Sequence, residues 1–371
     1  MLSRRSFLGG AAAAAGVAVA SPSLLHGWSL EPRRHSGTQD ESGPARLNSN
    51  ENAYGAFSSV LALPNPFLDT NRYPFRADDE LRQRIAAKHR VSPEQVLMGC
   101  GSTETIKTAV AAFTGPTRKL VMAAPTFEAA EMHARANGAQ VVHVPLTASY
   151  AHDIEGMLKV ADGAGLIYVC NPNNPTASLT PRRDLEALIA RAPKDTVIMI
   201  DEAYHDFVPA DADYRSFLDS PVNDERVIVA RTFSKIYGMA GLRLGYGVAS
   251  PETIKKMEAQ SQSDSVNIVA VRCGLAALAD DAAHTQAAAR NAQDRSEFLK
   301  QCAARRVAAI PSAANFVMVE TGRPVRQVIE HFGSRQVLVG RPFPPYNTHL
   351  RVSLGKPWEM ERFWNAWEAM A

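Results

Sequence analysis

The sequence predicts an α/β protein in which a mostly parallel sheet, covered by helices, is followed by a smaller α+β domain. From about residue 78, short runs of branched apolar residues alternate with segments of helical spacing. Continuous β-rich runs between helices are typical of parallel strands that are buried on both faces. After about residue 251, long alanine-rich segments replace this alternation. The composition, 46% hydrophobic and 21% charged, is that of an ordinary globular protein.

Length, charge and cysteine content exclude several classes of protein. The chain has 371 residues, enough for roughly two domains. Its formal net charge is +2, and no basic run carries interleaved aromatic residues, which argues against nucleic-acid binding. The four cysteines are far apart and form no C-x-x-C pair, so we expect no metal site and no disulfide framework.

The first 20 residues differ from the rest of the chain. An arginine pair at 4–5 is followed by an alanine-rich run and by Ala-Val-Ala at 18–20, the order of a charged region, an apolar region and a cleavage site. "SRRSFL" resembles the twin-arginine export signal of bacteria. An accidental arginine pair before an alanine-rich helix is the alternative. We therefore expect a signal peptide at 1–20 and a linker at 21–44. The protein would use the twin-arginine export machinery and would be periplasmic or otherwise exported. If the signal is not used, the protein would stay in the cytoplasm.

The elements expected between residues 45 and 250 form a large domain with an N-terminal arm. Helical spacing predicts helices at 78–89, 102–113 and 181–192. Apolar runs predict strands at 119–124, 139–146, 165–170, 196–200, 226–230 and 244–249. Thr180 and Pro181 would supply the N-cap and the first turn of the helix at 181–192.

The elements expected between residues 251 and 371 form interdomain helices and a small C-terminal domain. Helices are predicted at 252–262, 267–279 and 282–303. Strands at 315–320, 336–340 and 349–355 and a closing helix at 359–370 complete this part.

Polar residues directly follow three of the predicted strands. These are "NPNNPT" (171–176), "DEAYHDF" (201–207) and "RTFSK" (231–235). Ligands of open α/β sheets bind beyond the carboxyl ends of the strands. One such ending would normally be a turn, but three in series at this edge indicate a binding site.

The chemistry of these endings points to pyridoxal 5′-phosphate. Lys235 lies among small, aromatic and apolar residues, where a lysine amine can form a Schiff base with an aldehyde; a surface lysine is the alternative. Asp201 beside a pyridine nitrogen would keep it protonated and make the ring an electron sink. Residues 101–103 open a helix, whose N-terminus could bind a phosphate together with Arg243.

Six segments in order resemble the fold-type I, class I/II aminotransferases, and most of all the histidinol-phosphate aminotransferase family. They are "LNSNENAYGAF" (47–57), "NRYP" (71–74), "NPNNPT", "DEAYHDF", "RTFSKIYGMAGLRLGY" (231–246) and "HLRVSLG" (349–355). The resemblance runs from about Leu47 to the C-terminus. It implies a fold-type I, pyridoxal-phosphate-dependent transferase that works as a homodimer.

The resemblance also implies roles for individual residues. Lys235 would carry the cofactor, with Asp201 at the ring nitrogen. The other expected contacts are Asn174 and Tyr204 at the ring oxygen, Phe127 stacked on the ring, Gly101, Ser102, Thr103, Thr232, Ser234 and Arg243 at the phosphate, Tyr73 at the phosphate of the neighbouring subunit, Arg351 at the substrate carboxylate, and Asn50, Tyr54 and Asn174 near the substrate.

Some assignments have alternatives. Phe127 could be a core residue and Tyr54 a surface aromatic. The family usually has glycine after "NPNNPT", whereas this chain has Ala177, which would cost about 1 kcal/mol if the position needs a positive φ.

The expected activity is ping-pong transamination between an amino acid, or a histidinol-phosphate-like amine, and a 2-oxo acid. A decarboxylase of the threonine-phosphate type, or an oxidase or cyclase on the same scaffold, is the main alternative. Two non-enzymatic alternatives are disfavoured. A cofactor-binding regulator would need a DNA-binding module, which the sequence does not indicate. A relic that no longer binds the cofactor would have no use for Lys235, Asp201 and Arg243, which are all present. The identity of the amino donor stays open.

Overall fold

The computed structural model describes residues 43–370. The predicted signal at 1–20 and all but the end of the predicted linker lie outside the described residues. Within 43–370, no helix is both long and apolar enough to cross a membrane.

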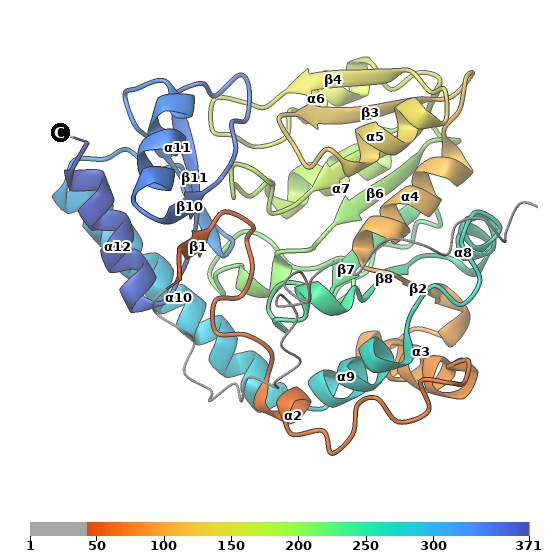
Figure 1. Cartoon of the computed structure of the whole chain (residues 1–371). Helices are drawn as coiled ribbons and strands as arrows, with labels where there is room; N and C mark the ends of the chain where they lie inside the picture. Colours follow the sequence, from red (N-terminus) through yellow and green to blue (C-terminus); the bar gives the residue numbers. More distant parts are fainter. Residues whose placement is uncertain (1–42, 371) are drawn as a thin grey trace, which may run out of the picture. The chain divides into compact units, whose positions relative to one another are not determined.

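A seven-stranded sheet forms the centre of the larger part of the described chain, in the order β2-β8-β7-β6-β5-β3-β4 (Figure 1). Its strands are β2 (Val96–Gly99), β3 (Lys119–Ala124), β4 (Val141–Pro145), β5 (Ala164–Cys170), β6 (Val197–Asp201), β7 (Val227–Thr232) and β8 (Gly245–Val248). All neighbours pair in parallel except β8, which is antiparallel to both β2 and β7. The predicted mostly parallel α/β sheet is therefore confirmed, whereas β2 was not predicted.

Helices bury both faces of this sheet. On β5, Leu166 and Tyr168 belong to one core and Ile167 and Val169 to the other, because successive side chains point to opposite faces. The surrounding helices are α2 (Ser58–Leu61), α3 (Phe75–His89), α4 (Ser102–Phe113), α5 (Ala129–Ala136), α6 (Ile154–Lys159), α7 (Arg182–Arg191), α8 (Pro251–Glu258) and α9 (Ile268–Leu278), with 3₁₀ turns η2 (Pro93–Gln95), η3 (His205–Phe207) and η4 (Ala240–Leu242). This two-sided burial explains why the strands read as continuous apolar runs.

One predicted helix cap is wrong. The N-cap of α7 is Pro181, which offers no side-chain hydrogen bond. The Thr180 hydroxyl instead accepts a hydrogen bond of 2.9 Å from the backbone N–H of His152. The threonine thus joins the loop before α6 to the loop before α7.

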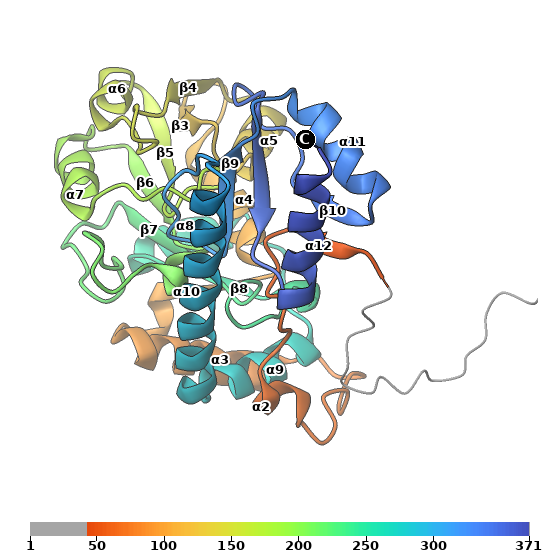
Figure 2. The same cartoon turned by 90° about the vertical axis from the view of Figure 1, so that its left-hand side faces the viewer.

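The C-terminal part has its own core beside the long helix α10 (Asp281–Ala304) (Figure 2). It contains β9 (Phe316–Glu320), α11 (Val325–Ser334), β10 (Val337–Val339), β11 (His349–Ser353) and α12 (Pro357–Glu368). Strands β9 and β11 pair antiparallel, and β1 (Ala45–Leu47) pairs in parallel with β10. The beginning of the predicted N-terminal arm therefore contributes a strand to the smaller part.

Candidate active site

A cavity of about 720 Å³ opens at the carboxyl ends of β5, β6 and β7. Twelve of the residues predicted from the sequence line it: Asn50, Ser102, Thr103, Phe127, Asn174, Asp201, Tyr204, Thr232, Ser234, Lys235, Arg243 and Arg351. Gly101 directly precedes the two residues that open α4. The edge of the sheet thus brings together side chains that are up to 300 positions apart in the sequence, as the rule for α/β sheets requires.

Lys235 points into this cavity from the loop after β7. Its Nζ lies 3.5 Å from the carbonyl oxygen of Ser49 and 5.4 Å from the ring centre of Tyr204. Burial, followed by the positive charge of Arg351, lowers the pKa of Lys235 to about 8. A lowered pKa leaves a sizeable fraction of the amine neutral near pH 7.5, and the neutral amine is the nucleophilic form.

Asp201, at the end of β6, is buried on the cavity floor. Its Oδ2 accepts a hydrogen bond of 2.7 Å from the hydroxyl of Tyr168, and its Oδ1 accepts one of 3.1 Å from the N–H of Ala203. Burial raises the pKa of Asp201 to about 6, although these two hydrogen bonds oppose the rise. Sequence reasoning missed Tyr168, because within an apolar run nothing marks it as a partner of a carboxylate on the next strand.

The start of α4 and the guanidinium of Arg243 form a cradle. Gly101 has φ +77°, and a Cβ at this position would lie 2.3 Å from Nη2 of Arg243. Nη1 of Arg243 donates to Ser234 Oγ (3.3 Å) and to the Ala240 carbonyl (2.9 Å). A Cβ on Gly245 would lie 2.2 Å from the backbone nitrogen of Ser102. Close backbone approach, helix N–H groups, hydroxyls and an arginine suit a phosphate.

Arg351 also lines the cavity. Its Nη1 donates to Asn174 Oδ1 (2.6 Å) and its Nη2 to the Asn48 carbonyl (2.8 Å). Its Nε is buried without a hydrogen-bond partner within the described residues, which leaves a donor for a ligand. Nearby, the Tyr204 hydroxyl accepts a hydrogen bond of 3.1 Å from Asn50 Nδ2. Burial lowers the pKa of Arg351 to about 10, so it stays cationic at neutral pH.

Besides Gly101, two predicted residues do not line the cavity that contains Lys235, which we call the lysine cavity. The Tyr54 hydroxyl donates to Asp294 Oδ2 (3.1 Å), and the residue lines a separate cavity of about 200 Å³, so its role near the substrate stays a prediction. Burial and the nearby Asp294 raise its pKa to about 12. Tyr73 is 73% exposed and stacks on Phe75 at 5.6 Å, so its role across a subunit boundary stays a prediction.

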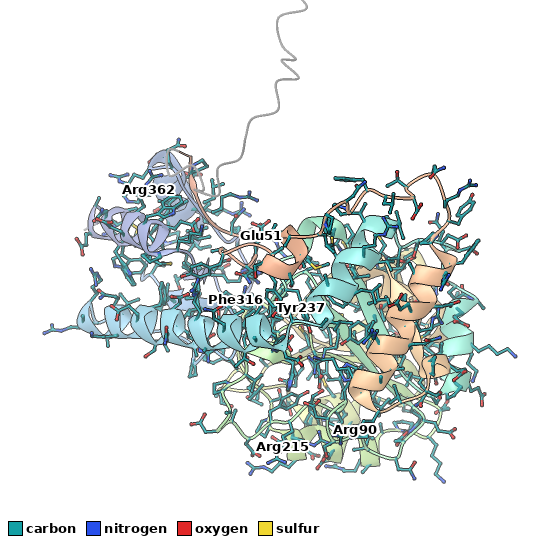
Figure 3. The ribbon with its side chains drawn as sticks, turned by 90° about the horizontal axis from the view of Figure 1, so that it is seen from below. Glu51, Arg90, Arg215, Tyr237, Phe316 and Arg362 are labelled. Carbon is teal, nitrogen blue, oxygen red and sulfur yellow. The ribbon has the colours of Figure 1, made fainter. Side chains whose placement is uncertain are left out.

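Three further residues qualify the predictions. Phe127 lines the cavity and also packs against the core between the sheet and α4, so its stacking on the cofactor ring stays a prediction. Ala177 has φ +57° and is fully buried, which confirms that this position needs a positive φ. Glu51, which was not singled out from the sequence, lines the cavity and lies between the C-terminal helices and the sheet part (Figure 3).

An ion pair at the mouth of the cavity was also not predicted. Arg341, in the segment after β10, pairs with Glu128, which directly precedes α5. Both side chains line the cavity and are about half exposed. Arg341 also lies over the ring of Phe343 at 4.3 Å, and Arg351 lies over the same ring at 4.6 Å.

Comparisons with known proteins agree with this geometry. A model of the family "Aminotransferase class I and II" matches residues 45–366. A histidinol-phosphate aminotransferase of Symbiobacterium thermophilum is 36% identical over 329 residues, 87% of this chain and 90% of that protein. The crystal structure of histidinol-phosphate aminotransferase from Sinorhizobium meliloti in complex with pyridoxal 5′-phosphate is similar with a TM-score of 0.81 and 27% identity, over 88% of this chain and 92% of that one. L-Threonine-O-3-phosphate decarboxylase from Porphyromonas gingivalis, at 21% identity and a TM-score of 0.74 over 88% of this chain and 99% of that one, shares the fold alone.

The fold is that of the fold-type I, pyridoxal-phosphate-dependent transferases. The chain belongs to the aminotransferase class I and II family. It is a transaminase, and its cofactor is pyridoxal 5′-phosphate. The decarboxylase alternative is not favoured. Within the described residues, no group of His, Cys, Asp and Glu side chains is arranged to hold a metal ion.

Proposed function

We propose that Lys235 binds the cofactor and moves the substrate proton, while Asp201 pairs with the ring nitrogen. The observation that carries this proposal is that both residues line one cavity, each with a pKa displaced towards neutrality. When bound, pyridoxal phosphate supplies an electron sink for negative charge at the substrate Cα. With the cofactor bound, the Nζ of Lys235 would take the proton from the substrate Cα and give it to the cofactor carbon.

The remaining cavity residues hold the cofactor in this proposal. The cradle of Gly101, Ser102, Thr103, Thr232, Ser234 and Arg243 binds the phosphate. Asn174 and Tyr204 contact the ring oxygen, and Phe127 covers the ring. These residues fit the group because the cradle supplies N–H, hydroxyl and guanidinium donors, which match an anion.

The amino donor carries an acidic group that Arg351 binds, and the acceptor is a 2-oxo acid. The buried free Nε of Arg351 and its fixed guanidinium support this assignment. The relatives named histidinol-phosphate aminotransferase suggest a phosphate-bearing amine as one donor. Aromatic amino acids and histidinol phosphate are the donors to compare, with 2-oxoglutarate as acceptor.

The decisive experiment replaces Lys235 with alanine. The variant should fold, lose the visible absorbance of the lysine-bound cofactor and lose formation of the keto product. Carbon dioxide release is measured in parallel in the wild type. Wild-type turnover in the variant would refute the role of Lys235, and carbon dioxide in place of a keto acid would refute transamination.

The enzyme works as a homodimer with shared active sites. Support comes from an exposed apolar stretch between residues 61 and 75, which includes Leu61 (76% exposed), Phe67 (67%) and Tyr73 (73%). Tyr73 then reaches the phosphate in the neighbouring subunit. Mixing Lys235→Ala chains with chains that carry Tyr73→Phe should restore part of the activity, because one site of the mixed dimer then combines Lys235 and Arg243 of one chain with Tyr73 of the other. Confirmed mixed dimers without recovery would contradict shared sites.

The enzyme is exported in folded form. The support is the order of the arginine pair, the apolar run and the small residues at the N-terminus. Replacing Arg4 and Arg5 with lysine should keep active protein in the cytoplasm, whereas the wild type should leave it and begin near Ser21. Wild-type protein found only in the cytosol with residues 1–20 attached would contradict export.

A further inference from the structure

Tyr168 joins two neighbouring strands below the candidate active site. It is fully buried on β5, and Cys170, two residues further along the same face, pairs with Asp201 of β6 in the sheet register. From this diagonal position the Tyr168 hydroxyl lies 2.7 Å from Asp201 Oδ2. The hydroxyl therefore contacts a carboxylate that faces the cavity, although the tyrosine itself does not line it.

The hydrogen bond from Tyr168 leaves Asp201 able to accept further hydrogen bonds. Each carboxylate oxygen has two lone pairs, and the structure uses one on Oδ2 for Tyr168 and one on Oδ1 for the N–H of Ala203. Two fixed donors hold the plane of the carboxylate and stabilise its charged form. The remaining lone pairs can accept the N–H of a protonated pyridine ring.

Other titratable groups surround the same carboxylate. Tyr168 and Cys170 face it from β5, Glu202 and Tyr204 follow it in the chain, and Lys235 faces it from the loop after β7. Among these groups, Tyr168 gives the largest opposition to the burial that raises the pKa of Asp201 to about 6.

We propose that Tyr168 is a positioning residue that keeps Asp201 ionised and aimed at the ring nitrogen of the cofactor at neutral pH. The inference rests on the proposed role of Asp201. Its consequence is thermodynamic. At a pH where Asp201 is already ionised in the cofactor-free protein, the Tyr168 hydrogen bond is equally strong before and after the cofactor binds. Removing the hydroxyl then weakens both states equally, and the affinity for the cofactor does not change. Where Asp201 is protonated before binding, the hydrogen bond strengthens on binding, and its loss weakens the affinity.

The chain offers a matched control. Tyr214 is also buried, and its hydroxyl donates at 2.7 Å to Oε1 of Glu202, the carboxylate next in sequence to Asp201. Glu202 does not line the lysine cavity. Tyr168→Phe and Tyr214→Phe therefore each remove a buried tyrosine–carboxylate hydrogen bond, but only the first removes one from Asp201.

The experiment measures the dissociation constant of pyridoxal phosphate for cofactor-free enzyme between pH 6 and 8.5, and the visible spectrum of bound cofactor over the same range. For Tyr168→Phe we expect about threefold weaker binding than wild type at pH 6.5 and near-equal binding at pH 8.5, since losing a hydrogen bond to a charged group would raise the Asp201 pKa from about 6 by about one unit. Tyr214→Phe should follow the wild-type pH profile, even if thermal unfolding shows that it is equally destabilised. With 3-fluorotyrosine at position 168, a stronger hydrogen-bond donor, the weakening of cofactor binding at low pH should begin at a lower pH than in the wild type. This variant tests the inference even if Tyr168→Phe does not fold.

Asp201→Asn distinguishes failure of the proposed role of Asp201 from failure of the inference about Tyr168. If Asp201→Asn binds the cofactor with the wild-type affinity and spectrum at every pH, the proposed role of Asp201 fails. If Asp201→Asn changes both readouts while the position-168 variants follow the wild type, only the inference about Tyr168 is overturned.

Discussion

Gly101→Ala tests whether the cradle at the start of α4 holds Arg243 for the cofactor phosphate. The added Cβ would lie 2.3 Å from Nη2 and 3.0 Å from Cζ of Arg243. An ordinary contact between such atoms is about 3.5 Å, so the guanidinium must withdraw by roughly 1 Å. Because it is the end of a flexible side chain, it can move without disturbing the sheet, and the damage should appear in cofactor binding more than in folding.

The size of the effect follows from the interactions that would be lost. Hydrogen bonds from an arginine to a charged group contribute about 1.5–3 kcal/mol, so the dissociation constant of pyridoxal phosphate should rise about 10- to 100-fold. Gly101 has φ +77° and ψ +161°, a backbone conformation that is almost restricted to glycine, so alanine there costs a further 1–3 kcal/mol or so of folding free energy. Spectroscopic titration of cofactor-free protein measures the first effect and urea unfolding measures the second.

Gly163→Ala is the matched control. Gly163 has φ +68°, similar to Gly101, but no heavy atom lies within 4 Å of the position its Cβ would take. Both variants should lose stability because both positions have a positive φ, while only Gly101→Ala weakens cofactor binding. If the two variants bind pyridoxal phosphate within twofold of each other, the contact between Gly101 and Arg243 does not form the phosphate site.

Three further predictions concern single side chains. In cofactor-free protein, the pKa of Lys235 is about 8 rather than 10.5. The unfolded state therefore binds the proton more tightly, and the resulting penalty of up to about 3 kcal/mol is complete below pH 8 and disappears as the pH rises to 10.5. Lys235→Met should accordingly be more stable than wild type in urea at pH 7.5, and the difference should shrink by pH 9.5; a constant difference would contradict the lowered pKa. Ala177→Gly relieves about 1–2 kcal/mol of strain but removes a buried methyl group that contributes about 0.8 kcal/mol, so urea unfolding should show a gain of at most about 1 kcal/mol, and a clear loss would mean that packing dominates. Asp201→Asn should slow deuterium exchange at the Cα of a bound amino donor by at least about 100-fold, and an unchanged exchange rate would exclude it as the partner of the ring nitrogen.

The parts of the site that the sequence predicts are those that depend on strand ends. Asn174, Asp201 and Lys235 follow three apolar runs directly, and those runs are neighbouring strands β5, β6 and β7 of one parallel sheet. Once the runs are identified as parallel strands, the meeting of their carboxyl ends is required by geometry. Which strands lie next to one another in the sheet can also be predicted well, because strands that are consecutive in the sequence usually lie side by side.

The parts that escaped prediction depend on register and on the path of loops. Tyr168 finds Asp201 only because Cys170 stands opposite Asp201, and a shift of the register by one residue would turn the hydroxyl to the other face. Glu128 and Arg341 are more than 200 positions apart and meet through loops with no periodic signal. Tyr54 follows a turn that carries it towards Asp294, a partner on α10 that no local pattern indicates.

The pKa values in the cavity show what burial does for the chemistry. Burial is the largest cause of both displacements: it raises the pKa of Asp201 to about 6 and lowers that of Lys235 to about 8. At pH 7.5 about a quarter of the amines would be neutral with a pKa of 8, against about 0.1% with a pKa of 10.5, while Asp201 stays mostly ionised. One low-dielectric cavity thus makes the amine about 200 times more available for attack without neutralising the carboxylate, because Tyr168 and the Ala203 N–H limit the rise of the Asp201 pKa. In a more deeply buried site without these donors, a larger fraction of the Lys235 amine would be neutral, but Asp201 would lose its negative charge. The two hydrogen bonds therefore allow both groups to work at the same pH.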